Sequence, residues 1–274
     1  RQRQMCIRDS YYNIRQFDAY TILTSPTIGW FSGHIRHHKY SYREEEQVVN
    51  PSINEDAYSV GGEWRKQFGS LDFRASAEFG ISGDRIGNYL FGEIRQPLFS
   101  SFSLTAGLRW QQQHPGFVFE QFTSSYADYQ WKNTAEMEQR TAIFTQLSHP
   151  DFGKLSLTTT NINNYAYYLQ PDASSLAIAP MQLSSGINLI QLDWEGGVKW
   201  GVFRLDMKVR GQQLSDNKEV MPMPNFIGRT ALYYEDHWFK KAMFLNLGVS
   251  ARYFSSYMMR AYHPLLSAFV VQSH

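Results

Sequence analysis

Residues 71–82, LDFRASAEFGIS, alternate between apolar and other side chains without a break. The odd positions are Leu71, Phe73, Ala75, Ala77, Phe79 and Ile81, and the even positions are Asp72, Arg74, Ser76, Glu78, Gly80 and Ser82. A β-strand sends successive side chains to opposite faces, whereas a helix would scatter these charges around its axis. The segment therefore predicts a strand with one wholly apolar face. It is long enough to cross a bilayer at a tilt, which takes roughly nine to eleven residues.

The same period of two returns along the chain, most clearly in residues 243–254, where the apolar positions are Met243, Leu245, Leu247, Val249, Ala251 and Tyr253. We predict about twelve strands, at residues 13–24, 28–43, 56–68, 71–82, 88–96, 102–110, a strand ending near 147, 155–168, 187–194, 203–210, 225–236 and 242–254, with a further strand in progress at residue 274. We expect no long helix. Consecutive strands without helices are typical of an up-and-down all-β sheet.

The predicted connections alternate in length. Those at 69–70, 97–101, 148–152, 195–201 and 237–241 are short, and those at 44–55, 111–127, 169–186 and 211–224 are long, with an intermediate one at 83–87. In an antiparallel meander, every second connection lies on the same edge of the sheet. Tight turns on one rim and long loops on the other are typical of an outer-membrane barrel. The seven tryptophans, Trp30, Trp64, Trp110, Trp131, Trp194, Trp200 and Trp238, mostly fall near predicted strand ends, where aromatic girdles lie in such barrels.

Composition agrees with this prediction. No apolar run reaches the roughly eighteen residues of a membrane helix, so a spanning structure would have to be a closed barrel. A mean hydropathy of -0.43 is compatible with one, because alternate residues of each barrel strand face water. A net charge of +1 without a concentrated basic segment argues against nucleic acid as a partner.

The first ten residues, RQRQMCIRDS, fit neither a strand nor a helix pattern, and MCIRDS resembles a translated sequencing-adapter scar. We expect residues 1–10 to be non-native and residues 11–274 to be a barrel truncated at both ends. Cys6 is the single cysteine, so no internal disulfide is possible.

Near the end of the chain, the sequence carries several local motifs. A proline-rich loop with Pro222 and Pro224 precedes the triplet at 232–234, and the turn FKKA at 239–242 leads into the alternating strand. A Tyr-x-Pro stretch at 262–264 and a Phe-x-x-Gln strand end at 269–272 follow. Over residues 223–272 the chain resembles the "putative porin" family of Bacteroidetes outer membranes.

The resemblance implies an outer-membrane β-barrel that forms a pore and has no catalytic residues. Because the chain ends before the family's last strands, we expect an incomplete transmembrane antiparallel up-and-down barrel of about 12–13 strands. A full barrel of about sixteen strands would leave an open channel, whereas one of eight would be filled by side chains.

If the apolar faces point outward, the charged residues of the other faces line the lumen. The predicted pore-lining residues are Asp72, Arg74, Glu78, Arg109, Arg204, Asp206, Lys208, Arg210 and Arg252. Rings of such groups set ion preference in a water-filled pore, and they can equally pair and fill a narrow or plugged interior. The polar face of residues 204–210 is three-quarters basic, which slightly favours anionic solutes.

Metal binding and catalysis are not expected. His34 and His38 share a strand face but lie about 13 Å apart along it, and His37 lies on the other face. No GxSxG, HExxH, Walker or Rossmann motif occurs. We expect no catalytic, metal or cofactor site.

The prediction is therefore a passive diffusion channel in the outer membrane of a Gram-negative bacterium, with lipid and small hydrophilic solutes as its partners. Two alternatives remain open at this point. One is a barrel with a closed lumen whose long loops, such as residues 116–129, contact a partner or a glycan. The other is a secreted, soluble carbohydrate-binding sandwich, in which the apolar faces would pack on each other.

Overall fold

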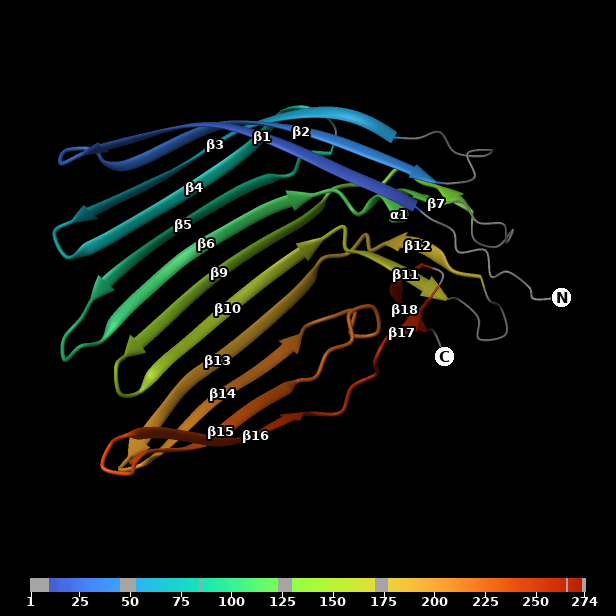
Figure 1. Cartoon of the computed structure of the whole chain (residues 1–274). Coiled ribbons are helices and arrows are strands. Elements are labelled where there is room, and N and C mark those ends of the chain that lie inside the picture. Colours follow the sequence, from blue (N-terminus) through green and yellow to red (C-terminus); the bar gives the residue numbers. More distant parts are fainter. Residues whose placement is uncertain are drawn as a thin grey trace.

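A computed structural model describes residues 10–44, 53–83, 85–122, 130–170, 177–264 and 266–272. Twelve strands form one antiparallel sheet, in which each strand pairs with its neighbours in chain order (Figure 1). They are β1 (Ser10–Ser25), β2 (Gly29–Glu44), β3 (Ile53–Phe68), β4 (Leu71–Ser82), β5 (Asn88–Pro97), β6 (Ser103–Gln113), β9 (Glu138–His149), β10 (Gly153–Asn163), β13 (Ile187–Trp200), β14 (Phe203–Leu214), β15 (Phe226–Trp238) and β16 (Met243–Phe254). The sheet curves strongly, and within the described residues β1 and β16 are not paired, so it is an open trough. The predicted all-β, up-and-down fold and incomplete barrel are confirmed.

Short elements occupy two of the connections and the segment after β16. The link between β6 and β9 contains α1 (Phe117–Glu120), β7 (Gln121–Phe122) and β8 (Trp131–Lys132). The link between β10 and β13 contains β11 (Ala166–Gln170) and β12 (Ala179–Gln182), and β17 (Ala261–His263) and β18 (Ala268–Gln272) follow β16. β11, β12, β17 and β18 form a second sheet in the order β12-β11-β18-β17, in which β11 and β18 are parallel. This small sheet lies at one end of the trough.

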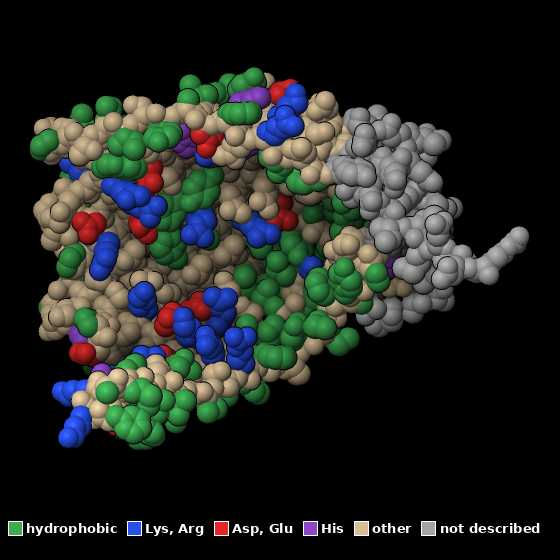
Figure 2. Space-filling model, viewed as in Figure 1, with side chains coloured by type: hydrophobic (Ala, Val, Ile, Leu, Met, Phe, Trp, Pro, Cys, Tyr) green, Lys and Arg blue, Asp and Glu red, His purple; other side chains and the backbone are tan. Residues whose placement is uncertain are grey.

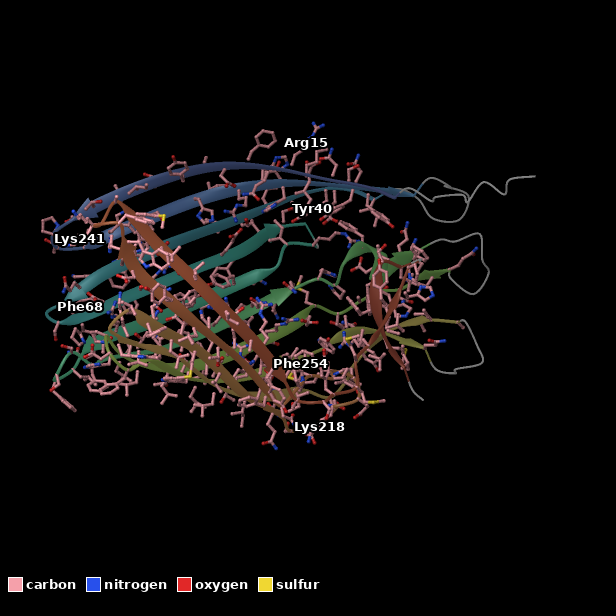
Figure 3. All side chains as sticks on the ribbon, turned by 60° about the horizontal axis from the view of Figure 1, so that its bottom comes forward. Arg15, Tyr40, Phe68, Lys218, Lys241 and Phe254 are labelled. Atoms are coloured by element: carbon pink, nitrogen blue, oxygen red, sulfur yellow. The ribbon has the colours of Figure 1, made fainter. Side chains whose placement is uncertain are left out.

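The connections separate by length between the two rims of the sheet. The turns at 26–28, 69–70, 98–102, 150–152, 201–202 and 239–242 lie on one rim, which we call the tight-turn rim. The described parts of the connections between β4 and β5, β6 and β9, β10 and β13, and β14 and β15 lie with the small sheet on the other rim, the long-loop rim. Figure 3 shows Phe68 and Lys241 at the first rim and Lys218, which belongs to the connection between β14 and β15, toward the second. The predicted segregation of connection lengths is therefore confirmed.

One tight turn depends on glycine. Gly153 has a φ of +81°, and a Cβ atom placed there would collide with the carbonyl oxygen of Glu195 on the neighbouring strand. Gly201 occupies the equivalent turn between β13 and β14 with a φ of +56°, but its missing Cβ would meet nothing within 4 Å. The left-handed backbone conformation favours glycine at both positions. Of the two, only Gly153 also lacks room for a Cβ atom.

The apolar faces of the strands are exposed. Val249 is 79% exposed, Ile143 61% and Phe79 44%. All extensive contacts of the large sheet's described strands are with hydrogen-bonded neighbours, so no second sheet or helix packs over this face. A buried core occurs instead near the long-loop rim, where two clusters gather around Ile187 and Val270.

Several predicted strand boundaries were wrong, and three strands show the physical reasons most clearly. The strand predicted at 187–194 continues to Trp200, because Gly196 and Gly197 interrupt the side-chain pattern without interrupting the pairing. The strand predicted at 155–168 ends at Asn163, since Asn164 adopts a φ of +55° and turns the chain into β11. The partial strand at 13–24 is a full strand of sixteen residues.

The last predicted segment also differs. The strand expected to be in progress at the chain's end is β18, which joins the small sheet and not the barrel wall. Residues 1–9, which make up most of the segment expected to be non-native, lie outside the described residues, and Ser10 begins β1.

Candidate functional site

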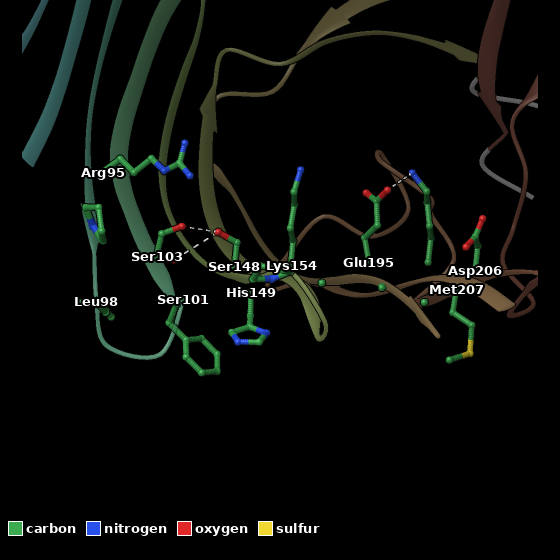
Figure 4. A pocket seen from close by; sticks show the side chains of 17 residues that line it. Arg95, Leu98, Ser101, Ser103, Ser148, His149, Lys154, Glu195, Asp206 and Met207 are labelled. Atoms are coloured by element: carbon green, nitrogen blue, oxygen red, sulfur yellow. Dashed lines mark hydrogen bonds and ion pairs between the residues drawn. The ribbon is translucent and has the colours of Figure 1, made fainter. Parts of the chain in front are cut away.

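The concave face of the trough carries the charged side chains (Figure 2). Figure 4 shows that Arg95, Lys154 and Glu195 point into the space that the sheet encloses, whereas His149 and Met207 point away from it. Residues that stand directly opposite each other in an antiparallel pair share a face. The register therefore extends this inner face from strand to strand across the whole sheet.

All nine predicted residues lie on this inner face. Asp72 stands opposite Arg95, and Arg74 and Glu78 follow on the same side of β4. Lys208 stands opposite the inward-facing Glu195. Arg204, Asp206 and Arg210 lie at even spacings from Lys208 on the same strand, so they also face inward. Arg109 lies six residues from the inward-facing Ser103 on the same strand, so it too faces inward. Lys208 stands opposite Arg229, and Arg229 stands opposite Arg252, so Arg252 shares the inner face with Lys208.

Inner-face charges on β13, β14 and β15 form short ion pairs across the strands. Lys208 Nζ lies 2.6 Å from Glu195 Oε1, and Arg210 Nε lies 2.6 Å from Asp193 Oδ1. Two cations share the buried carboxylate of Glu235, since Arg204 Nη1 lies 2.6 Å and Lys199 Nζ 3.1 Å from it. These pairs fix the side chains against the wall, and part of the charge is thereby neutralised.

A second network joins β1, β2, β3 and β4. Arg36 donates to Asp18 Oδ1 at 2.8 Å and to Glu78 at 2.6 Å, and the hydroxyl of Ser59 donates to Glu78 at 2.8 Å. Nearby, Glu63 accepts from both Arg65 and Arg74. Arginine suits such sites because its planar fork donates several hydrogen bonds at once.

Three of the nine residues are not paired. Within the described part of the chain, Asp72, Arg109 and Arg252 form no ion pair. Arg109 and Arg74 flank the ring of Phe91, each with its guanidinium carbon 5.7 Å from the ring centre. An aromatic ring between two arginines is a favourable cation–π arrangement on an otherwise wet surface.

Most partner residues were missing from the prediction. They are Asp18, Arg36, Glu63, Asp193, Glu195 and Glu235. The alternation of β13 and β15 would have identified three of them, but glycines and inward-facing apolar residues blurred the pattern there. Arg36 lies in the run GHIRHHKYSYR, where both faces of the strand are polar and the sequence does not indicate which one faces inward.

Near the tight-turn rim, the inner face is hollowed into a recess of about 720 Å³. Arg95, Lys154, Lys208, Glu195 and Asp206 contribute charged side chains to it, and Ser103 and Ser148 share a hydrogen bond of 2.7 Å at its wall (Figure 4). The recess thus presents basic side chains and hydrogen-bonded hydroxyls to the interior of the trough.

At the long-loop rim, the connections fold onto the inner face. Phe117 of α1 stacks on Tyr42 with ring centres 5.4 Å apart and contacts Tyr12 at 5.2 Å, both of them inward residues of β1 and β2. Tyr165 and Val220, from two other connections, pack on the inward side chains of β10, β13 and β14. These contacts cover part of the trough at this end and leave the charged middle open.

A polar cluster anchors α1 to the wall. Glu120 accepts hydrogen bonds from Arg85, and His114 Nδ1 lies 2.7 Å from its carboxylate. Burial raises the pKa of the Glu120 carboxyl, but these hydrogen bonds and the charge of Arg85 outweigh burial and hold the pKa below its usual value. Close by, burial raises the pKa of Tyr168 to about 12, so that its hydroxyl stays neutral.

Aromatic rings concentrate at the tight-turn rim. Trp64 contacts Phe73 at 5.0 Å, and Trp200 contacts Phe203 at 6.2 Å. Trp238 is 44% exposed at the last residue of β15. Trp194 departs from the expected position near a strand end, since it lies in the middle of β13. Amphipathic rings in such a band are typical of the membrane–water boundary.

The three histidines do not converge. His37 Nε2 lies 2.8 Å from Asp56 on the outer face, whereas His34 and His38 lie on the inner face. Among the described residues, no group of three or more His, Cys, Asp or Glu side chains is placed to hold a metal ion.

No helix within the described ranges is long and apolar enough to cross a membrane. No curated protein sequence matches the chain significantly. A protein family does match, over residues 7–274, and it is described as "Putative porin". The match covers nearly the whole chain, including the strands upstream of residue 223, where no local motif is evident. The chain therefore belongs to this family of porins.

Proposed function

We propose that this chain forms the wall of an outer-membrane channel through which small hydrophilic solutes diffuse passively, with no chemical step. The membrane is that of a Gram-negative bacterium, and the resemblance noted above suggests one of the Bacteroidetes. The observation that carries the proposal is the division of one sheet into an exposed apolar face and a charged concave face.

The energetics of the two faces support this. An exposed sheet face rich in Ile, Leu, Val and Phe is costly in water and stable in acyl chains. Between β1 and β16, backbone hydrogen bonds run from each strand to its neighbours, so the backbone polar groups of the ten inner strands are satisfied within the sheet, as a wall in lipid requires. The concave face supplies charges and hydroxyls that keep an aqueous path wet.

The contents of the inner face argue against a filled interior. Many of its long charged side chains are held in pairs along the wall, and the recess near the tight-turn rim is lined by the exposed side chains of Arg95, Lys154 and Lys208 together with two carboxylates. The predicted pore-lining residues thus remain candidates for contact with passing solutes.

A closed barrel with a binding role is the second candidate function. The fold of α1 onto Tyr12 and Tyr42 favours it, because the long connections already cover part of one end. A soluble sandwich has no support in the fold, since nothing packs on Phe79 or Val249 within the described chain.

Conductance separates the two. The full-length protein, reconstituted into a planar lipid bilayer, should give stepwise ohmic conductance in KCl. A protein that inserts, as judged by protection from protease in vesicles, but never conducts would refute the channel and favour the closed barrel. A protein that stays monomeric and soluble without detergent would refute both.

A further inference from the structure

Three basic residues stand in direct register on the inner faces of the last three strands of the sheet. Lys208 of β14 is paired with Arg229 of β15, which is paired with Arg252 of β16. Directly opposed residues have Cβ atoms about 4.5–5.5 Å apart, and like charges at this spacing destabilise a sheet. On the other side, Lys154 of β10 continues the same row through Glu195. We call these four cations the basic row.

The row has one carboxylate for its four cations. Glu195 lies 2.6 Å from Lys208 Nζ. Within the described part of the chain, Lys154, Arg229 and Arg252 form no ion pair. The repulsion that the register imposes is therefore left largely uncompensated by the protein.

The excess of positive charge is local to this half of the wall. The inner faces of β10 to β16 carry seven basic residues against four acidic ones, namely Lys154, Lys199, Arg204, Lys208, Arg210, Arg229 and Arg252 against Asp193, Glu195, Asp206 and Glu235. Among the side chains that the structure describes, the inner faces of β1 to β9 carry six basic residues against seven acidic ones, namely Arg36, Arg65, Arg74, Arg95, Arg109 and Arg140 against Asp18, Glu55, Glu63, Asp72, Glu78, Glu93 and Glu138. Figure 2 shows the Lys and Arg side chains gathered over the lower strands.

The basic row is open to solutes. The side chain of Lys208 is 57% exposed, and Arg229 and Arg252 are exposed as well. Guanidinium groups bind carboxylate and phosphate oxygens in a bidentate manner, and a bound anion would offset the repulsion between the opposed cations. Such a site holds anions weakly enough to release them, because it lies in water on an open wall.

We propose that the basic row binds small solutes bearing carboxylate or phosphate oxygens and makes the channel prefer anions over cations. This inference rests on the proposed channel function and specifies its solute class. It is carried by the register of three like charges, not by the net charge of the chain, which is only +1.

The test is the reversal potential of the reconstituted full-length channel in a tenfold KCl gradient. The wild type should pass chloride in preference to potassium. A unit charge about 7 Å away in water attracts an anion by about RT, and salt near 0.1 M halves this, so that removing two such charges should lower the anion preference about two- to threefold. The double variant R229Q/R252Q makes this change.

Two controls isolate the row. K218Q removes a positive charge from the connection between β14 and β15, outside the basic row, and should leave the selectivity unchanged. R229K/R252K keeps both positive charges of the row and should retain the preference for anions. Inorganic phosphate added to one side should reduce the chloride current in the wild type and much less in R229Q/R252Q. If the double variant fails to insert, R252Q alone provides the same comparison.

Failure of this inference is distinct from failure of the channel. A conducting protein that prefers potassium, or whose selectivity and phosphate block are the same in R229Q/R252Q as in the wild type, overturns the anion site alone. An inserted protein that never conducts overturns the proposed function, on which the site depends.

Discussion

Substitution of Leu157 by arginine tests which side of the sheet faces lipid. Leu157 lies on the outer face of β10, where it is 49% exposed, four residues from Gly153 at the tight-turn rim. At a rise of about 3.3 Å per residue and a tilt of about 40°, it lies about 10 Å from that rim, close to the middle of an apolar band about 25 Å tall.

The expected cost follows from that depth. An arginine facing lipid near the midplane destabilises a barrel by about 2–4 kcal/mol, which corresponds to a factor on the order of 100 in the folding equilibrium. The neighbouring substitution Thr158→Arg is the matched control, because Thr158 points to the inner face, opposite Gln191. A solvated surface arginine there should change the free energy of unfolding by no more than about 0.5 kcal/mol.

The assay is urea-dependent unfolding of the full-length protein from lipid vesicles, followed by tryptophan fluorescence and by its mobility on unheated gels. L157R should shift the midpoint to lower urea while T158R stays near the wild type. If the two variants were equally stable, or if T158R were the weaker, the apolar face would not contact lipid and the reasoning would be refuted.

Three further outcomes follow from the fold. The depressed pKa of Glu120 means that its ion pairs stabilise α1 fully above the ordinary glutamate pKa, and that this stabilisation is lost as the pH falls through the folded value. The hydrogen-exchange protection factors of α1, which are corrected for the pH dependence of intrinsic amide exchange, should therefore fall in acid for the wild type and change little with pH in E120Q. Phe117→Ala removes the ring that packs on β1 and β2 and should increase protease sensitivity of the connection between β6 and β9 without loss of barrel insertion; unchanged cleavage would contradict the docking. Gly153→Ala should cost clearly more than the roughly 1 kcal/mol expected for Gly201→Ala, measured by the same urea titration, and equal costs would exclude a steric role for the turn.

The strands with the cleanest alternation were predicted best from the sequence. The prediction for residues 71–82 matches β4 at both ends, because a period of two over twelve residues leaves no other register for its apolar face. The sorting of loops between the rims was equally accessible, since it needs only the order of strands and turns.

The partners of the predicted pore-lining residues were not accessible in the same way. Pairing depends on which residues of two strands stand opposite each other, and the offset between β14 and β15 is set by a connection of eleven residues that carries no repeat. Nor does the alternation reveal that the connections fold inward. The contact of Phe117 with Tyr42 joins residues 75 positions apart in the sequence and is visible only once the sheet has curved.

Every pair of hydrogen-bonded strands in the large sheet consists of strands that follow each other in the chain order of that sheet. A hairpin can therefore be gained or lost by duplication or deletion of a short stretch of sequence without disturbing the pairing of the strands that remain. The diameter of a barrel built in this way can increase or decrease in steps of two strands during evolution, while each hairpin keeps its apolar outer face and its polar inner face.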